Sequence, residues 1–192
     1  TRGHRIVDGL ETHNSRHIDK PTFGYAGWAD VLDMLGNPDS PNLLYQFSTA
    51  FASGISLASS WNLELAEEVG NAVGKEMECY GVTYWLAPGL NIHRNPLCGR
   101  NFEYYSEDPV LAGNAAMEFA IGALEYGLIA APKHYAFNDQ ETNRAGVAPY
   151  MTEQRAREVD LRAYQIPFEA SKYDTDDYDA GMRGLMTSFS KI

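Results

Sequence analysis

The chain has 192 residues, of which 44% are hydrophobic, so it can bury one core of ordinary size. Its formal net charge of -11 argues against nucleic acid and anionic membranes as partners, because both bind clusters of Lys and Arg. A neutral or cationic partner fits this charge better.

No stretch of the chain approaches the roughly 18 to 20 apolar residues of a membrane span. The first nine residues also lack the apolar run of a signal peptide. We therefore expect a soluble protein, with the cytoplasm favoured as its compartment. The spacing of Cys79 and Cys98 matches no zinc motif, so the sequence predicts neither a metal site nor a cofactor.

Residues 1–50 are rich in Gly, His, Asn, Asp and Pro and have no sustained helix or strand period. We expect a loop-rich entry segment there, with one short helix at Ala29–Leu35. Trp61–Tyr80 differs, because apolar side chains recur every three or four residues and acidic side chains fill the opposite face. Gly81 ends this predicted amphipathic helix, and Val82–Ala87 follows as a short buried strand.

The same order of elements then repeats. Asp108 before Pro109 predicts the start of a helix that ends near Tyr126, because Asp is a common N-cap and Pro a common first residue of helices. The apolar run Leu128–Ala131 follows as the next strand. Residues 51–192 therefore read as successive βα units.

A third helix is predicted from its cap at Thr152, with a kink at Pro167. The acidic segment Asp174–Asp179 reads as a loop, and Gly184–Phe189 as another strand. Helices that alternate with short buried strands imply parallel pairing and an α/β fold.

Both a doubly wound sheet and a barrel fit this order of elements. The long polar segments Pro88–Glu107 and Lys133–Met151 follow strands rather than helices, which is where barrels build active sites and which favours a barrel. About three strands are legible, whereas a (β/α)8 barrel needs eight. We therefore expect part of a TIM-type barrel, incomplete in this chain.

Two places in these polar segments carry side chains suited to binding hydroxyl groups. Arg100 offers a rigid planar fork of donors that can hold two neighbouring hydroxyls, and Glu103 can hold that fork from behind. A structural ion pair is the alternative for these two residues. Lys133 and His134 come directly after an apolar strand, which places an ammonium and an imidazole over the barrel mouth.

Three segments together resemble glycoside hydrolase family three. They run from Pro88 to Pro109, from Lys133 to Thr142 and from Met186 to Ser190, in the family's order and at similar separations. The likeness covers residues 47–192, and the Gly-Arg-Asn-Phe-Glu-Tyr run that contains Arg100 is its most specific part.

The resemblance implies roles for individual residues. Family residues that match Arg100, Lys133 and His134 hold the hydroxyls of the sugar in the cleaved subsite. An early family aspartate binds the outer hydroxyls, and Asp8 before Gly9 is its best match, although this dipeptide also caps turns. We expect Lys133 to donate to one hydroxyl and His134 to its neighbour, with neither acting as acid or base.

The resemblance also implies which groups to expect elsewhere. A retaining enzyme needs two carboxyl groups about 5 Å apart, one as nucleophile and one as acid/base. The family's nucleophile lies on a strand after the one that matches residues 186–189, and its acid/base lies on a second domain. We therefore expect no catalytic residue in this chain, and a companion polypeptide that completes the barrel.

The expected activity is hydrolysis of terminal non-reducing β-D-glucosyl residues, from a β-glucoside or a cello-oligosaccharide. The family's N-acetylglucosaminidase branch carries a histidine-containing stretch after Lys-His, which residues 135–142 lack. Glu141 in this stretch is expected to support the site rather than to catalyse. A β-xylosidase, a non-catalytic carbohydrate-binding fragment and an unrelated phosphate-binding α/β enzyme are the alternatives, and the last lacks the usual Gly-rich loop.

Overall fold

The structure is a computed structural model that describes residues 49–173 and 182–191, without the side chains of 171–173. Several predictions from sequence lie outside these residues: the short helix Ala29–Leu35, the acidic loop Asp174–Asp179 and the candidate ligand Asp8. The chain divides into two compact units, of which the second contains residues 51–75 and 83–192. The fold is described for this second unit.

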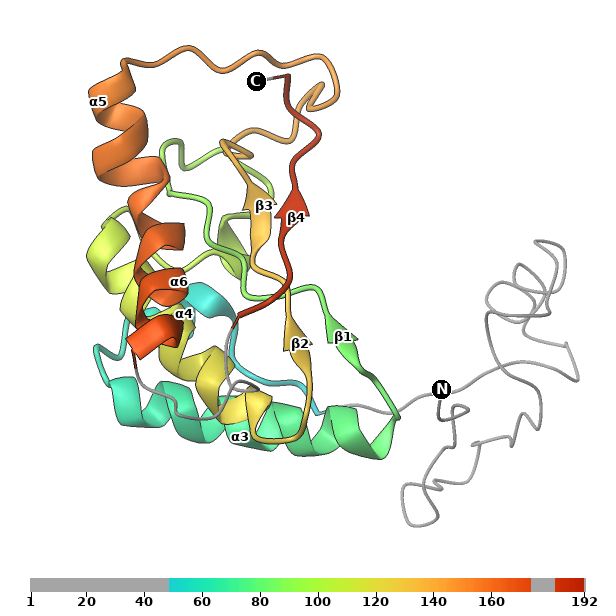
Figure 1. Ribbon diagram of the computed structural model, residues 1–192. Coiled ribbons are helices and arrows are strands. Elements are labelled where there is room, and N and C mark those ends of the chain that lie inside the picture. Colours follow the sequence, from blue (N-terminus) through green and yellow to red (C-terminus); the bar gives the residue numbers. More distant parts are fainter. Residues whose placement is uncertain (1–48, 174–181, 192) are drawn as a thin grey trace, which may run out of the picture. The chain divides into compact units, whose positions relative to one another are not determined.

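The helices and strands alternate along the chain as predicted, except that β3 follows β2 without a helix between them (Figure 1). Their bounds are α2 (Gly54–Ala58), α3 (Leu63–Cys79), β1 (Tyr84–Trp85), the 3-10 turn η1 (Asn101–Glu103), α4 (Pro109–Leu124), β2 (Ile129–Ala130), β3 (Lys133–Tyr135), α5 (Glu153–Arg155), the π-helical turn η2 (Ala156–Asp160), α6 (Arg162–Tyr173) and β4 (Met186–Thr187).

Helix α4 begins as its sequence predicts. The side chain of Asp108 accepts hydrogen bonds from the backbone N–H groups of Val110, at 2.7 Å, and Leu111, at 3.0 Å. Pro109 occupies the first turn, where its missing N–H leaves no bond unmade. The predicted amphipathic helix is confirmed as α3.

The third predicted helix is divided where the sequence gave no indication. The hydroxyl of Thr152 caps α5 by accepting from the Arg155 N–H, as expected. The chain then passes through the wider turn η2 before α6 begins, and α6 continues through Pro167. In η2 the buried Asp160 binds Arg155 at 2.9 Å, which ties the two ends of the turn together.

The strands are parallel, and β2 and β3 lie in one extended run of chain (Figure 1). β1 pairs with β2 and β3 pairs with β4, and further backbone hydrogen bonds join these two pairs. Lys133 N–H donates to Pro88 O at 2.9 Å, and Met186 N–H donates to Pro132 O at 3.0 Å. The run 129–135 is therefore flanked by β1 on one side and β4 on the other.

The structure corrects one detail of the sequence analysis. Lys133 and His134 belong to strand β3 and not to the loop after a strand. Pro132 follows the apolar run and has no N–H to give, so the ladder is interrupted there and resumes at Lys133. The peptide bond between Lys133 and His134 is cis.

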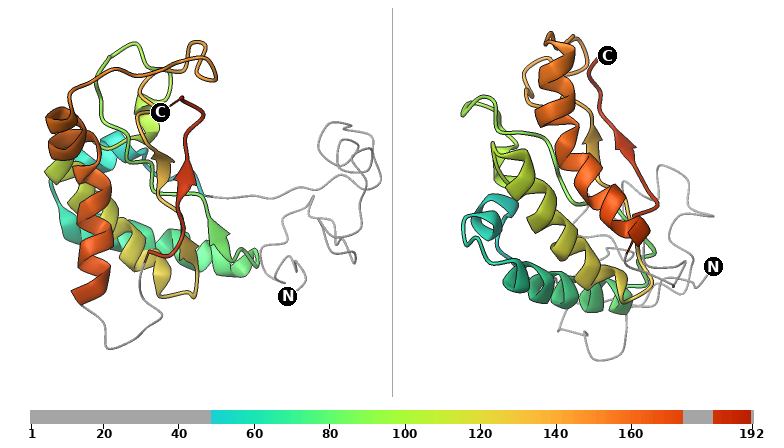
Figure 2. Two further views of the ribbon diagram at one scale, coloured as in Figure 1. Left: turned by 45° about the horizontal axis from the view of Figure 1, so that its top comes forward. Right: turned by 60° about the vertical axis from the view of Figure 1, so that its left-hand side comes forward.

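Helix α4 packs closely on α3 and on α6 through its glycines, and α4 and α6 lie side by side (Figure 2). A Cβ at Gly122 would collide with the backbone oxygen of Glu67 on α3, and one at Gly113 would lie 2.9 Å from the Ile166 side chain on α6. The core includes the buried residues Leu57, Ala66, Leu90, Ile92, Tyr105, Ala112, Ala116, Ala163 and Tyr164.

Parallel strands joined through helices confirm the α/β class. Among the described residues, none of the helices has the length and apolar character needed to cross a bilayer.

Candidate functional site

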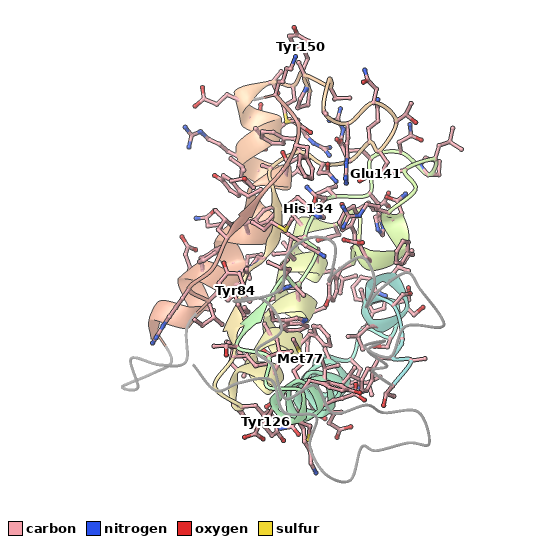
Figure 3. All side chains as sticks on the ribbon, turned by 90° about the vertical axis from the view of Figure 1, so that its right-hand side faces the viewer. Met77, Tyr84, Tyr126, His134, Glu141 and Tyr150 are labelled. Atoms are coloured by element: carbon pink, nitrogen blue, oxygen red, sulfur yellow. The ribbon has the colours of Figure 1, made fainter. Side chains whose placement is uncertain are left out.

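Charged and polar side chains gather where the strands end. They come from the segment after β1, from η1, from β3 and from the segment after β3. In Figure 3, His134 and Glu141 lie near one another at this end, and Tyr126, which precedes β2, lies at the opposite end. We call the set Asn91, Arg100, Glu103, Tyr104, Lys133, His134, Asn138 and Glu141 the strand-end cluster.

Arg100 is held by two hydrogen bonds to one carboxylate. Its Nε donates to Glu103 Oε2 at 3.1 Å and its Nη2 donates to Glu103 Oε1 at 2.6 Å. Its Nη1 lies 3.8 Å from Glu141 Oε1, beyond hydrogen-bond distance. Glu103 therefore fixes the guanidinium plane as predicted, and the Nη1 edge retains donors for another acceptor.

Lys133 approaches the same carboxylate from β3. Its Nζ lies 3.6 Å from Glu103 Oε1, which is an ion pair rather than a hydrogen bond, and its side chain is 20% exposed. An ammonium has three donors and no acceptor. The negative charge of Glu103 thus holds Lys133 near Arg100. The ammonium still has donors available to a ligand.

Glu141 lies on the far side of Arg100 and is itself restrained. Its Oε1 accepts from Asn138 Nδ2 at 2.8 Å, and its Oε2 accepts from Arg144 Nη1 at 3.2 Å. The Arg144 guanidinium also lies over the ring of Phe189, 4.6 Å from its centroid. A carboxylate with these partners is suited to a supporting role, and the expectation that Glu141 supports the site rather than catalyses stays a prediction.

His134 is almost completely buried, at 2% exposure, and is surrounded by amide and hydroxyl groups. Asn91 Oδ1 accepts from the His134 backbone N–H at 2.8 Å, and Asn91 Nδ2 donates to the His134 carbonyl at 3.0 Å. The His134 Nδ1 faces Tyr104 Oη at 3.2 Å and Asn91 Oδ1 at 3.3 Å. The described residues offer its Nε2 no hydrogen bond.

Burial and charge act together on the ionisation of this cluster. Burial first, and then the positive charges of Arg100 and Lys133, lower the pKa of His134 to about 4. Burial also opposes the charge of Arg100, but the Glu103 hydrogen bond and nearby carboxylates outweigh it and raise the Arg100 pKa. Burial raises the pKa of Tyr104 as well. At neutral pH the imidazole and the phenol are uncharged and the guanidinium is charged.

Of the four residues singled out from the sequence as sugar ligands, the fold brings Arg100, Lys133 and His134 together, and Asp8 lies outside the described residues. Three further members of the cluster were not predicted from the sequence: Asn91, Tyr104 and Asn138, which are all at most 2% exposed. Asn91 lies between the buried residues Leu90 and Ile92, and an amide between two core positions was a signal that could have identified it. Tyr104 and Asn138 carry no comparable mark in the sequence.

Within residues 49–173 and 182–191, no three His, Cys, Asp or Glu side chains are grouped so that they could hold a metal ion. The donors that remain open belong to Arg100 and Lys133, which bind oxygen acceptors and not metals.

Comparison with known proteins places these residues in a family. The sequence model of one protein family, described as the N-terminal domain of glycosyl hydrolase family 3, matches residues 42–175. Beta-glucosidase A of Butyrivibrio fibrisolvens is 47% identical over 119 residues, which are 62% of this chain and 14% of that protein. Thermostable beta-glucosidase B of Acetivibrio thermocellus is 43% identical over 118 residues, 62% of this chain and 16% of that protein.

A solved structure gives the same result at the level of the fold. Beta-glucosidase 3B of Thermotoga neapolitana, in complex with glucose, superposes with a TM-score of 0.70 and 46% identity. The match covers 81% of this chain and 21% of that one. The chain thus spans about a fifth or less of the length of these relatives.

Proposed function

Because the chain belongs to glycosyl hydrolase family 3, we propose that it forms the sugar-binding part of the active site of a retaining β-glucosidase. The reaction is hydrolysis of terminal non-reducing β-D-glucosyl residues from a β-glucoside or a cello-oligosaccharide. The observation that carries the proposal is the convergence of Arg100, Lys133 and His134 at the ends of parallel strands, where Arg100 and Lys133 have donors that none of the described residues takes up.

Sugar hydroxyls need such donors in a fixed geometry. The double hydrogen bond to Glu103 restrains Arg100, and the ion pair with the same carboxylate restrains Lys133. Both side chains are about one fifth exposed, so they are held by the protein and still reachable. Groups fixed in advance lose little conformational entropy when a ligand binds.

The two carboxylates of the cluster are assigned to holding these groups and not to chemistry. Glu103 is engaged by Arg100 and Lys133, and Glu141 by Asn138 and Arg144. A nucleophile or acid/base needs a carboxyl group that faces the glycosidic bond. We propose that both catalytic carboxyl groups come from parts of the enzyme beyond the described residues, and that residue 8 supplies a further sugar ligand.

Lys133 and His134 are proposed to bind hydroxyls away from the cleaved bond. A cation close to the anomeric carbon would oppose the positive charge that develops there during retaining hydrolysis. Azide commonly replaces a lost catalytic carboxylate, so it should not restore turnover to Lys133→Ala. Recovery of turnover with azide would make Lys133 a direct catalyst and would refute this role.

The partial sheet is proposed to belong to a (β/α)8 barrel completed by further polypeptide, either a companion chain or a continuation of this one. Large apolar side chains in or next to β1 and β4 support this, since Tyr84 and Leu86 are each 49% exposed and Leu185 is 42% exposed. Open strand edges and apolar faces favour association with a partner.

The test is the activity of the complete enzyme that contains this chain. We expect it to hydrolyse 4-nitrophenyl β-D-glucoside with retention of configuration, as followed by NMR of the first-formed sugar. A clear preference for the β-D-xyloside would make it a β-xylosidase. Binding of glucose without hydrolysis of either substrate would favour a non-catalytic carbohydrate-binding protein.

A further inference from the structure

We propose that Asn91 is a positioning residue that holds neutral His134 with its proton on Nδ1, so that Nε2 presents a lone pair and accepts a hydrogen bond from a ligand. This differs from the expectation that His134 donates to a hydroxyl. The identification of the ligand as a sugar rests on the proposed function, whereas the position of the proton rests on the hydrogen bonds around the imidazole.

The orientation of the Asn91 amide is fixed from both sides by one residue. Its oxygen accepts from the backbone N–H of His134 at 2.8 Å, and its nitrogen donates to the backbone carbonyl of His134 at 3.0 Å. Exchanging oxygen and nitrogen would place two donors together and two acceptors together. Asn91 therefore presents its oxygen, and not its NH2 group, to the His134 ring.

That oxygen determines the state of Nδ1. It lies 3.3 Å from Nδ1 and can only accept a hydrogen bond. An unprotonated Nδ1 would bring two lone pairs together in a buried site, where such repulsion is poorly screened. A proton on Nδ1 turns the same contact into an attraction.

The hydrogen bonds between Tyr104 and Asn138 are compatible with a proton on Nδ1 of His134. Tyr104 Oη accepts from Asn138 Nδ2 at 3.0 Å and donates to the Asn138 carbonyl at 3.3 Å. It then has an acceptor site left for Nδ1–H, which lies 3.2 Å away. The opposite tautomer would take the Tyr104 proton for His134 and leave the Asn138 carbonyl without this donor.

The charges that face the ring keep it neutral, so that only one nitrogen carries a proton. Burial opposes a positive imidazole most, the charges of Arg100, Lys133 and Arg144 also oppose it, and Glu103 favours it. The cluster therefore offers a ligand two kinds of contact. Arg100 and Lys133 donate, and His134 Nε2 accepts, so that one ligand hydroxyl can receive a hydrogen bond and give its own proton to Nε2.

Neutron diffraction of the deuterium-exchanged complete enzyme, without ligand, tests the tautomer directly. We expect deuterium on Nδ1 and none on Nε2 of His134. Deuterium on Nε2, alone or together with Nδ1, would overturn the proposal. Because no sugar is present, this result is independent of whether the protein is a β-glucosidase.

Tyr104→Phe separates the two possible tautomers. We expect Nδ1 to keep its deuterium in this variant, because Asn91 still accepts from it. If Tyr104 were instead the donor to a bare Nδ1, the unaltered enzyme would carry its deuterium on Nε2 and loss of Tyr104 would move it. A deuterium position that differs between the two proteins, or deuterium on Nε2 in either, would therefore overturn the proposal.

Asn91→Ala tests the consequence for binding, with inhibition constants of glucose and its monodeoxy analogues. We expect glucose to bind roughly five- to tenfold more weakly, the effect of one lost hydrogen bond. The analogue that lacks the hydroxyl facing Nε2 should bind the variant and the unaltered enzyme equally. Weakening of every analogue by the same factor would overturn the positioning role.

Asn114→Ala is the matched control, because it removes an exposed amide that donates to Val110 O on α4. It should leave all inhibition constants unchanged. Failure of glucose to inhibit the unaltered enzyme would contradict the proposed function and would leave the neutron result to decide the tautomer.

Discussion

The packed helices and the strand-end cluster differ in how their residues contact one another. The helices approach closely because glycine has no side chain: Gly70 and Gly122 allow the backbones of α3 and α4 to come into direct contact. In the cluster, contact is made by long side chains such as Arg100 and Lys133, whose donors are only partly used. The helix interfaces therefore have no room for added atoms, whereas the cluster keeps hydrogen-bond donors for a ligand.

This difference has a physical consequence. Close packing stabilises the fold and tolerates no added volume. Hydrogen-bond donors that are held in place without a protein acceptor contribute little to folding, and a ligand can use them. Substitutions in the two regions should therefore separate loss of stability from loss of activity, with the helices affecting the first and the cluster the second.

The largest effect is expected for Arg100→Ala in the complete enzyme. Loss of a donor fork in a sugar site should cost about 2 to 4 kcal/mol in the transition state, or roughly 30- to 1000-fold in kcat/KM. The melting temperature should change little. Arg157→Ala, which breaks an exposed pair with Glu153, is the control and should retain full activity. Unchanged kinetics in folded Arg100→Ala would place the sugar elsewhere.

Gly122→Val should have the reverse profile. Its Cβ would collide with the backbone oxygen of Glu67, so α3 and α4 must separate, at a cost of about 1 to 3 kcal/mol in unfolding free energy. The folded fraction should keep its kcat. Gly99→Ala is the control for stability, because nothing lies within 4 Å of the added atom. Equal melting temperatures for both variants would mean that the helices do not pack as described.

Acid should weaken the fold through His134. Its pKa is lowered from 6.5 to about 4 in the folded protein, so the unfolded chain takes up a proton first as the pH falls. This contribution to stability is complete above pH 6.5 and is lost progressively down to about pH 4. Melting temperatures across this range should fall more for the unaltered enzyme than for His134→Gln. Parallel curves would show that His134 is not buried in its neutral form.

Glu141→Gln should have the smallest effect. Arg100 keeps both hydrogen bonds to Glu103, and the amide can still accept from Asn138. We expect kcat/KM to fall by less than about tenfold, since a partly exposed ion pair contributes about 1 kcal/mol or less. A loss as large as that of Arg100→Ala would show that Glu141 contacts the reacting sugar and does more than support Arg100.

The sequence predicted the elements whose causes are local. Asp108 and Pro109 mark the start of α4 because capping depends on adjacent residues, and the period of three to four residues marks α3. The division of the third helix at η2 was not predicted, because it depends on the contact of Arg155 with Asp160 rather than on the proline. The sequence located the strands but not their ends. Where a strand ends depends on which backbone groups of neighbouring strands pair, and the effect of Pro88 and Pro132 on this pairing is not visible in the sequence.

The same distinction holds for the site. The pairing of Arg100 with Glu103 was predicted because the two residues are only three positions apart in the chain. Asn91 and Asn138 were missed because each acquires its role from residues more than thirty positions away. Tertiary proximity of this kind leaves no periodic mark in the sequence.

The most direct test of the account is a crystal structure of the complete enzyme with glucose bound. We predict sugar hydroxyls within about 2.7 to 3.2 Å of Arg100 Nη1, Lys133 Nζ and His134 Nε2. The anomeric carbon should face away from all three. Glucose bound elsewhere, or with its anomeric carbon against Lys133, would contradict the assignment of the strand-end cluster as the sugar-binding site.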